Sequence, residues 1–129
     1  MHEVEKILVV EDNADIRHLV VFLLELEGYT LIEAPDGEQA IEILKGSHVD
    51  LVLLDVMMPG IDGLEVLKQI RCGACADNIT TPVVMLTAKT QVTDVNLAVS
   101  LGANAYIKKP FKAEDLREKV EELLLHVAS

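Results

Sequence analysis

The chain alternates short apolar runs with segments in which apolar residues recur at the period of a helix. The first run, residues 7–10, is apolar without alternation, as is typical of a strand covered on both faces. After it, apolar residues return at the i, i+3, i+4 and i+7 spacing of a helix face, and similar stripes follow the later runs. The five runs that predict strands are residues 7–10, 30–32, 51–54, 82–86 and 105–107.

Local signals mark where the intervening helices begin and end. Asn13, Asp36 and Asp62 are predicted N-caps, and the last two are each followed three residues later by Gln or Glu. Gly28 and Gly102 are placed to end helices. Five strand–helix units of this length predict an α/β fold, (βα)5, in which helices cover both faces of a doubly wound five-stranded parallel sheet.

Composition favours a single cytoplasmic domain. The length of 129 residues suits one domain, and a hydrophobic content of 50% excludes intrinsic disorder. A formal net charge of −11 repels a phosphate backbone, so we expect no direct contact with nucleic acid. No uncharged apolar run approaches the roughly 18 residues of a membrane span, so we expect no membrane contact. Two cysteines are too few for a disulfide scaffold and fit a reducing cytosol.

Charged and polar residues follow several of the predicted strands. Glu11 and Asp12 follow the first, Asp55 the third and Thr87 the fourth, and Lys109 comes shortly after the fifth. Parallel strands bring their carboxyl ends to one edge of a sheet, so we expect these groups to converge there. Two like charges about 4 Å apart repel by roughly 4 kcal/mol at an effective dielectric constant near 20, so the carboxylates need a cation. All-oxygen ligands favour Mg²⁺, and a hydroxyl, a lysine and Mg²⁺ around one carboxylate would receive a phosphoryl group.

These residues stand in a familiar order. The motifs are Glu11-Asp12, Asp55 within Leu-Leu-Asp-Val-Met-Met-Pro-Gly, Thr87-Ala88, and Tyr-Ile-Lys-Lys-Pro-Phe over residues 106–111. Together they resemble the receiver domain of two-component response regulators, of the chemotaxis-regulator kind. The resemblance covers the whole chain, residues 1–129, as one domain. It implies the flavodoxin-like strand order 2-1-3-4-5.

The resemblance also implies a role for each acidic residue. Asp55 would be the phosphoacceptor, which takes a phosphoryl group from a phosphohistidine on a sensor histidine kinase or phosphotransfer protein. Asp12 and Asp55 would bind Mg²⁺ directly, and Glu11 would act mainly through water. The backbone carbonyl of Met57 would be a further ligand. The domain would thus catalyse only its own phosphorylation and dephosphorylation, and would not be a turnover enzyme.

The resemblance further implies a conformational switch. Thr87 and Lys109 would contact the phosphoryl oxygens, and Thr87 would move toward them while the Tyr106 ring turns inward. The Lys109–Pro110 peptide bond is expected to be cis. The fourth helix, fifth strand and fifth helix would form the surface that controls a downstream protein or an output domain. We expect a monomer or a weak phosphorylation-dependent dimer, either as a stand-alone receiver or as part of a longer protein.

Three alternatives are weighed against this interpretation. A phosphatase of the haloacid dehalogenase type also uses an aspartyl nucleophile, but it needs a second acid where this chain has Met57. A flavin-binding module would need a phosphate loop where Glu11 and Asp12 stand. A pseudo-receiver, which is a pure interaction domain, usually lacks part of the acidic, Thr and Lys set that this chain retains.

Three further features of the sequence bear on this interpretation. Cys72 and Cys75 form a CxxC pattern after the third helix, which we interpret as an incidental loop because no second pair or nearby His completes a metal site. Met57 and Lys89 occupy positions from which a polar side chain could orient an attacking water. Met57 cannot do so, and Lys89 would tend to hold the phosphoryl charge instead. We therefore hypothesise slow self-dephosphorylation. The fourth helix, about residues 91–101, is built from modest helix formers and is predicted to be the most mobile.

Overall fold

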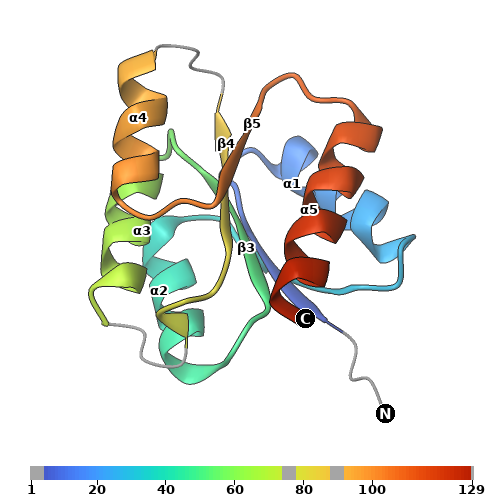
Figure 1. Ribbon diagram of the computed structural model, residues 1–129, viewed down its shortest axis with the longest axis horizontal. Coiled ribbons are helices and arrows are strands. Elements are labelled where there is room, and N and C mark those ends of the chain that lie inside the picture. The colour runs from blue at the N-terminus through green and yellow to red at the C-terminus, as the bar shows by residue number, and fades with distance from the viewer. Residues whose placement is uncertain (1–4, 74–77, 88–91, 129) are drawn as a thin grey trace.

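A computed structural model describes residues 5–73, 78–87 and 92–128, with the side chains of residues 92–95 and 126–128 left aside. Five strands alternate with five helices along these segments (Figure 1). The strands are β1 (Lys6–Val10), β2 (Thr30–Ala34), β3 (Leu51–Asp55), β4 (Val83–Thr87) and β5 (Ala105–Lys108). The helices are α1 (Ala14–Glu25), α2 (Gly37–Gly46), α3 (Gly63–Arg71), α4 (Val92–Ser100) and α5 (Ala113–Ala128).

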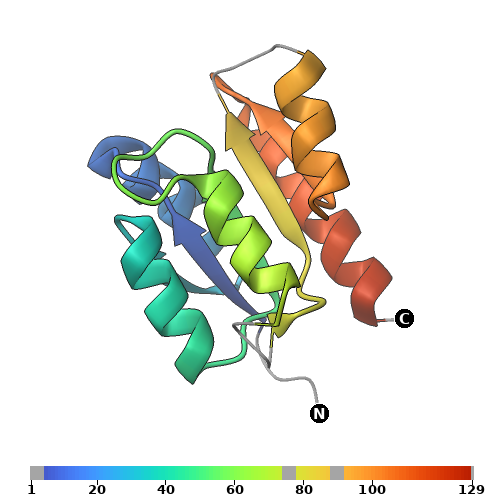
Figure 2. The same ribbon diagram turned by 90° about the vertical axis from the view of Figure 1, so that its left-hand side faces the viewer.

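The sheet has the predicted order. Its strands pair in parallel as β2-β1-β3-β4-β5, so both the fold class and the strand order are confirmed. Helices α1 and α5 cover one face, and α2, α3 and α4 cover the other (Figures 1 and 2). This arrangement brings the carboxyl ends of β1, β3, β4 and β5 to one edge of the sheet.

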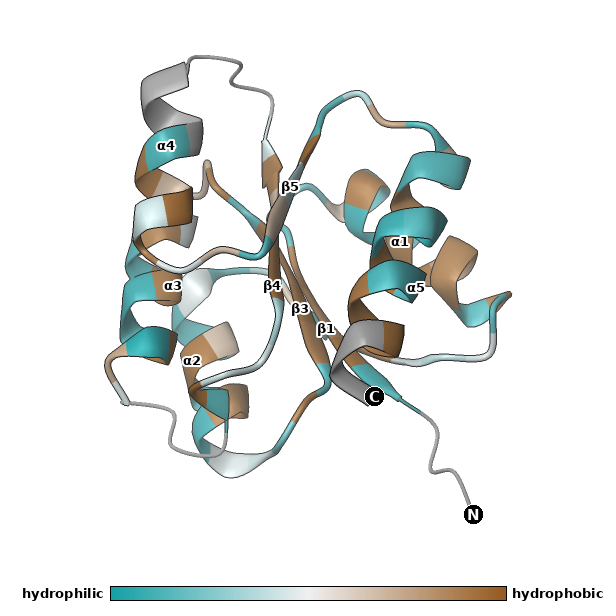
Figure 3. Ribbon diagram, in the orientation of Figure 1, coloured by the Kyte–Doolittle hydropathy of each residue, from teal (hydrophilic) through white to brown (hydrophobic). Residues whose placement is uncertain are grey.

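Alternation along the central strands divides the core in two. Leu8 and Val10 of β1 belong to the cluster under α2, α3 and α4, whereas Ile7 and Val9 belong to the cluster under α1 and α5. All four side chains are fully buried, and burial of each such side chain stabilises the fold by roughly 1.5–3 kcal/mol. Figure 3 shows the hydrophobic colour concentrated along these central strands.

The predicted helix signals are found at the ends of the helices. The side chain of Asn13 accepts a hydrogen bond from the Ile16 amide at 3.0 Å, which caps α1. Asp36 and Asp62 cap α2 and α3 in the same way, each accepting from the amide three residues on. Gly28 has φ +93° just beyond α1, a left-handed conformation that side chains with a Cβ rarely adopt.

The strands run further at their carboxyl ends than the apolar runs predict. β3 ends at Asp55, β4 at Thr87 and β5 at Lys108, because the ladder continues through the pairs Asp55–Leu86 and Thr87–Lys108. Backbone pairing therefore fixes a polar residue in the last position of each of these three strands. Within the residues that the structure describes, no helix has the length and apolar character needed to cross a membrane.

Candidate functional site

Asp55 is held in a buried position at the end of the central strand β3. Its side chain is 3% exposed, and its Oδ1 accepts a hydrogen bond from the Met57 amide at 3.2 Å. The first turn of α3 lies against the Asp55 backbone: a Cβ on Gly63 would be 2.1 Å from the Asp55 carbonyl oxygen. Gly63 is thus needed for this close approach, and its amide donates to the Val56 carbonyl at 3.1 Å.

Glu11 and Asp12 follow β1, and the structure places them differently. Glu11 is 1% exposed and its Oε2 accepts from the Asn13 amide at 3.1 Å, whereas Asp12 is exposed. Arg17 Nη1 donates to the Glu11 backbone carbonyl at 2.9 Å, and its Nε lies 3.0 Å from Glu33 Oε1. Arg17 supports this end of the site. It was not among the predicted site residues, although a cation one turn into a helix whose other residues are largely apolar is a partial signal.

The carboxylates and the lysine meet, as expected, at the edge of the sheet. Oxygen atoms of Glu11, Asp12 and Asp55 lie within 4.8 Å of one another. Lys109 reaches this cluster from the end of β5: its Nζ forms an ion pair with Glu11 Oε1 and lies 3.3 Å from Asp55 Oδ1. Residues separated by nearly the whole chain therefore form one compact charged group.

The cluster carries more negative charge than the lysine can balance. Burial raises the pKa of Asp55 from its ordinary value to about 7, and a hydrogen bond and charge repulsion from Glu11 add to this rise. Lys109 and the Met57 amide act in the opposite direction without cancelling it. A buried carboxyl group with this pKa marks a site that needs further positive charge to hold Asp55 ionised at neutral pH.

The donor set fits Mg²⁺. All three side chains offer carboxylate oxygens, which suit a hard divalent cation, and the exposure of Asp12 leaves room for the water ligands that Mg²⁺ retains. The excess negative charge inferred from the pKa of Asp55 is an independent reason why a cation would be favoured here. Glu11, Asp12 and Asp55 are the side chains that could hold it.

Thr87 and Tyr106 share one face of the sheet. Thr87 is in register with Lys108 and Met85 with Tyr106, and residues two apart on a strand point to the same side. Met85 belongs to the core under α2, α3 and α4, so Thr87 and Tyr106 also lie on that face. Thr87 is buried, whereas Tyr106 is 47% exposed. The Lys109–Pro110 peptide bond that follows β5 is cis, as expected.

Some of the predicted residues fall elsewhere. Cys72 is exposed just beyond α3, and its Sγ donates to the Gln69 carbonyl at 3.4 Å. Cys75, Ala88 and Lys89 lie outside the described residues. Met57, two residues after Asp55 in sequence, is 53% exposed and is not buried with it.

A family model for the response regulator receiver domain matches residues 7–121 of the chain. The chain belongs to this family. The predicted resemblance is thereby confirmed, and it places this receiver domain in two-component signal transduction, with histidine kinases and output domains as the partners of its family.

The receiver domain is similar to regulators and to isolated receivers. It is 43% identical over 119 residues to the transcriptional regulatory protein CpxR of Escherichia coli (strain K12), covering 92% of this chain and 49% of CpxR. The chain spans about half the length of the curated relatives it matches.

Solved structures show the same architecture. The chemotaxis protein CheY4 of Vibrio cholerae superposes with a TM-score of 0.88 at 30% identity, over 94% of this chain and 99% of CheY4. The receiver domain of the sensor histidine kinase PA1611 of Pseudomonas aeruginosa superposes with a TM-score of 0.85 at 29% identity, over 95% of this chain and 98% of the other. That structure has a magnesium ion coordinated in its active site cleft.

Proposed function

We propose that this receiver domain is a phosphorylation-dependent switch in which Asp55 accepts a phosphoryl group from a phosphohistidine. One observation carries the proposal: a buried carboxylate at a strand end, with its pKa raised to about 7, lies beside two further carboxylates and a lysine. A structural aspartate in the core would be paired fully with cations or amides, whereas this one is left short of positive charge.

The proposed reaction is a direct transfer. A carboxylate oxygen of Asp55 attacks phosphorus, the bond from phosphorus to the donor imidazole nitrogen breaks, and the electron pair of that bond returns to the imidazole. The product is an acyl phosphate. In the proposed reaction Lys109, 3.3 Å from Asp55 Oδ1, would neutralise charge on the transferred oxygens, and the Thr87 hydroxyl at the end of β4 would donate to one of them. When bound by Glu11, Asp12 and Asp55, Mg²⁺ would supply positive charge beside the nucleophile and the phosphoryl group.

A docking surface for the phosphodonor adjoins this site. An apolar pocket of about 410 Å³ is lined by Ile16 and Leu19 of α1, by the Lys109 stem, and by Pro110 and Phe111. Lys109 thus borders the pocket with its methylene groups and the acidic cluster with its ammonium. A helical donor protein that covers this pocket would bring its phosphohistidine close to Asp55.

Exposed apolar side chains continue from this pocket along α1. Leu19 is 50% exposed, and Phe22 and Leu26, one and two turns further, are 59% and 66% exposed. Exposed apolar side chains at this spacing form a stripe, and such stripes mark protein–protein contacts. The stripe supports a protein rather than a small molecule as the physiological donor.

The output step would use the β4–β5 face. In the proposed switch, Thr87 moves toward the phosphoryl group and Tyr106, which is now 47% exposed, turns toward the space that Thr87 leaves. The change would be read from α4, β5 and α5 by a downstream protein or an output domain.

Incubation with acetyl phosphate and Mg²⁺, followed by intact mass spectrometry, tests the proposal. We expect the gain of one phosphoryl group in the wild type, its loss in Asp55→Asn and its loss when EDTA replaces Mg²⁺. Asp115→Asn, which changes an exposed aspartate on α5, is the matched control and should be modified like the wild type. Equal modification of Asp55→Asn and the wild type would contradict the proposal, and no modification of either protein would favour a pseudo-receiver.

A further inference from the structure

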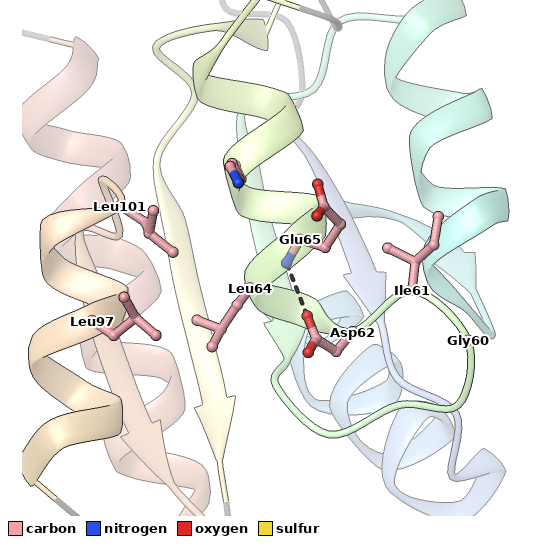
Figure 4. Close-up of a pocket in the computed structure, with 8 residues that line it drawn as sticks. Gly60, Ile61, Asp62, Leu64, Glu65, Leu97 and Leu101 are labelled. Atoms are coloured by element: carbon pink, nitrogen blue, oxygen red, sulfur yellow. Dashed lines mark hydrogen bonds between the residues drawn. The ribbon is translucent and has the colours of Figure 1, made fainter.

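An open groove separates the N-terminal part of α3 from α4. It has a volume of about 490 Å³, and its apolar walls are Leu64 of α3 and Leu97 and Leu101 at and after the C-terminal half of α4 (Figure 4). Leu97 is 45% exposed within it. Along this stretch α4 is therefore not closely packed on α3, and the groove leaves space for the helix to move sideways.

The C-terminal half of α4 is joined to the body of the domain by several contacts. Of the side chains described in this helix, residues 96–100, Ala98 is the buried one, whereas Leu97 and Val99 are exposed. Leu101 and Ala103, just beyond the helix, pack against the core, and the Ala103 amide donates to the Ala98 carbonyl at 3.0 Å. The C-terminal half of α4 is thus attached to the body of the domain close to the point where the helix ends.

Arg71, the last residue of α3, closes the other end of the gap between the two helices. Its Nε donates to the Gly102 carbonyl at 3.0 Å, and its Nη2 donates to Asn104 Oδ1 at 2.9 Å. Its Nη1 donates to the Ile79 carbonyl at 3.0 Å. One guanidinium group therefore joins the end of α3, the α3–β4 connection and the connection from α4 to β5.

Gly102 and Asn104 are both suited to this arrangement. Gly102 has φ +104°, and a Cβ there would be 2.9 Å from Arg71 Nε, so a larger residue would displace the guanidinium group. Asn104 Oδ1 also accepts from the Val83 amide at 2.9 Å, and the Asn104 amide donates to the Val83 carbonyl at 2.9 Å. The anchor of α4 is thereby tied to the first residue of β4, the strand that ends at Thr87.

The charged guanidinium group of Arg71 donates hydrogen bonds to carbonyl oxygens. Among the described residues no carboxylate forms an ion pair with it, and burial lowers the pKa of its guanidinium group. The group sits where α3 ends and beside the chain that leaves α4, where both helices present the negative ends of their dipoles. Removing the guanidinium group would leave the Gly102 and Ile79 carbonyl groups without this partner.

We propose that Arg71 is a positioning residue that anchors the C-terminal end of α4 and makes Gly102 the point about which this helix moves. The open groove beside Leu97 leaves space into which the helix can move, and the hydrogen bonds of Arg71 to Gly102 and Asn104 hold the chain just beyond the end of the helix. The anchor does not depend on phosphorylation. Its use as a pivot during signalling rests on the proposed function.

Residue-resolved amide hydrogen exchange tests the anchor in the unphosphorylated protein. In the wild type we expect protection to increase from Asn96 and Leu97 toward Gly102 and Ala103. Arg71→Met should raise the exchange rates of the Gly102 and Ala103 amides at least tenfold and flatten this gradient. Arg71→Lys, which keeps the charge and loses the planar fork, should give an intermediate rise of at least threefold and provides a milder variant if Arg71→Met folds poorly.

Lys68→Met is the matched control, because it removes a cation from the exposed side of the same helix. Its effect on the Gly102 and Ala103 amides should stay below twofold. The proposed anchor would be overturned if the exchange rates of the Gly102 and Ala103 amides in both Arg71 variants stayed within twofold of the wild type. An equal rise of these rates in Lys68→Met would overturn it as well.

A second arm adds acetyl phosphate and Mg²⁺. In the phosphorylated wild type we expect the exchange rate of the Leu97 amide to change and those of the Gly102 and Ala103 amides to stay the same. Equal changes at all three amides would overturn the proposal that the helix moves about Gly102. If the protein is not phosphorylated at all, the proposed function fails, while the first arm still decides on the anchor.

Discussion

Replacing Asp55 by asparagine should stabilise the protein when no divalent cation is present. The side chain is 3% exposed and lies against Glu11 in a cluster with excess negative charge. Asparagine has nearly the same shape, removes the charge and offers an amide N–H toward Glu11, as a protonated carboxyl group would. The substitution would therefore relieve repulsion at the cost of the proposed chemistry.

The magnitude follows from the pKa of Asp55, which is about 7 in the folded protein and near 3.8 in an unfolded chain. Below about pH 3 the carboxyl group is protonated in both states and carries no penalty. As the pH rises from about 4 to 7 the unfolded state loses its proton first, so the stability of the wild type falls. Above pH 7 the full penalty is present, at most about 4 kcal/mol.

Urea unfolding in EDTA, followed by circular dichroism, measures this effect. The stability difference between Asp55→Asn and the wild type should be small near pH 3.5 and should grow to between about 1 and 4 kcal/mol at pH 8. Asp115→Asn should show no such growth, since Asp115 is exposed. A difference that is independent of pH, or a variant less stable than the wild type at pH 8, would refute the electrostatic reasoning.

Four further predictions concern the site and its surroundings. Mg²⁺ at a concentration about 100 times its dissociation constant should raise the unfolding free energy by about 2.7 kcal/mol, as measured by urea unfolding. The same Mg²⁺ concentration should give a smaller gain in Asp12→Asn. Leu19→Ala should slow phosphoryl transfer from a histidine kinase severalfold and leave the rate with acetyl phosphate unchanged; equal slowing of both rates would count against the docking pocket. Gly63→Ala should cost more than about 2 kcal/mol of unfolding free energy, because its Cβ would lie 2.1 Å from the Asp55 carbonyl oxygen; full stability would show that the backbone yields there. Met57→Asn should accelerate phosphate release from the phosphorylated protein, and an unchanged rate would end the hypothesis of slow self-dephosphorylation.

The fold could be predicted because its signals are local. The unbroken apolar run of β1 and the caps at Asn13, Asp36 and Asp62 each depend on a few consecutive residues. The parallel sheet then follows from the order of the elements. The order of the strands does not follow from the order of the elements, because it depends on which pairs of strands meet. It was predicted from the resemblance to receiver domains.

The sequence allowed the residues of the site to be predicted, but not most of the contacts between them. Position after a strand was enough to single out Glu11, Asp55 and Lys109. The ion pair of Lys109 with Glu11 joins residues 98 positions apart, so its geometry depends on the whole fold.

Long-range polar contacts of loop residues had no sequence signal. Asn78 is fully buried: its amide donates to the Leu44 and Ser47 carbonyls, and its Oδ1 accepts from the Val49 amide at 2.9 Å. A polar residue in a connection between elements ordinarily indicates exposure. Its burial, like the three contacts of Arg71, depends on how connections distant in sequence meet at the amino-terminal edge of the sheet.

The most direct test of the central claim locates the modified side chain. After incubation with acetyl phosphate and Mg²⁺, borohydride reduces an aspartyl phosphate to homoserine, and tandem mass spectrometry identifies the altered residue. We predict homoserine at position 55 and at no other aspartate. Homoserine at position 12, or no reduced residue in a protein that has gained a phosphoryl group, would contradict the assignment of Asp55 as the phosphoacceptor.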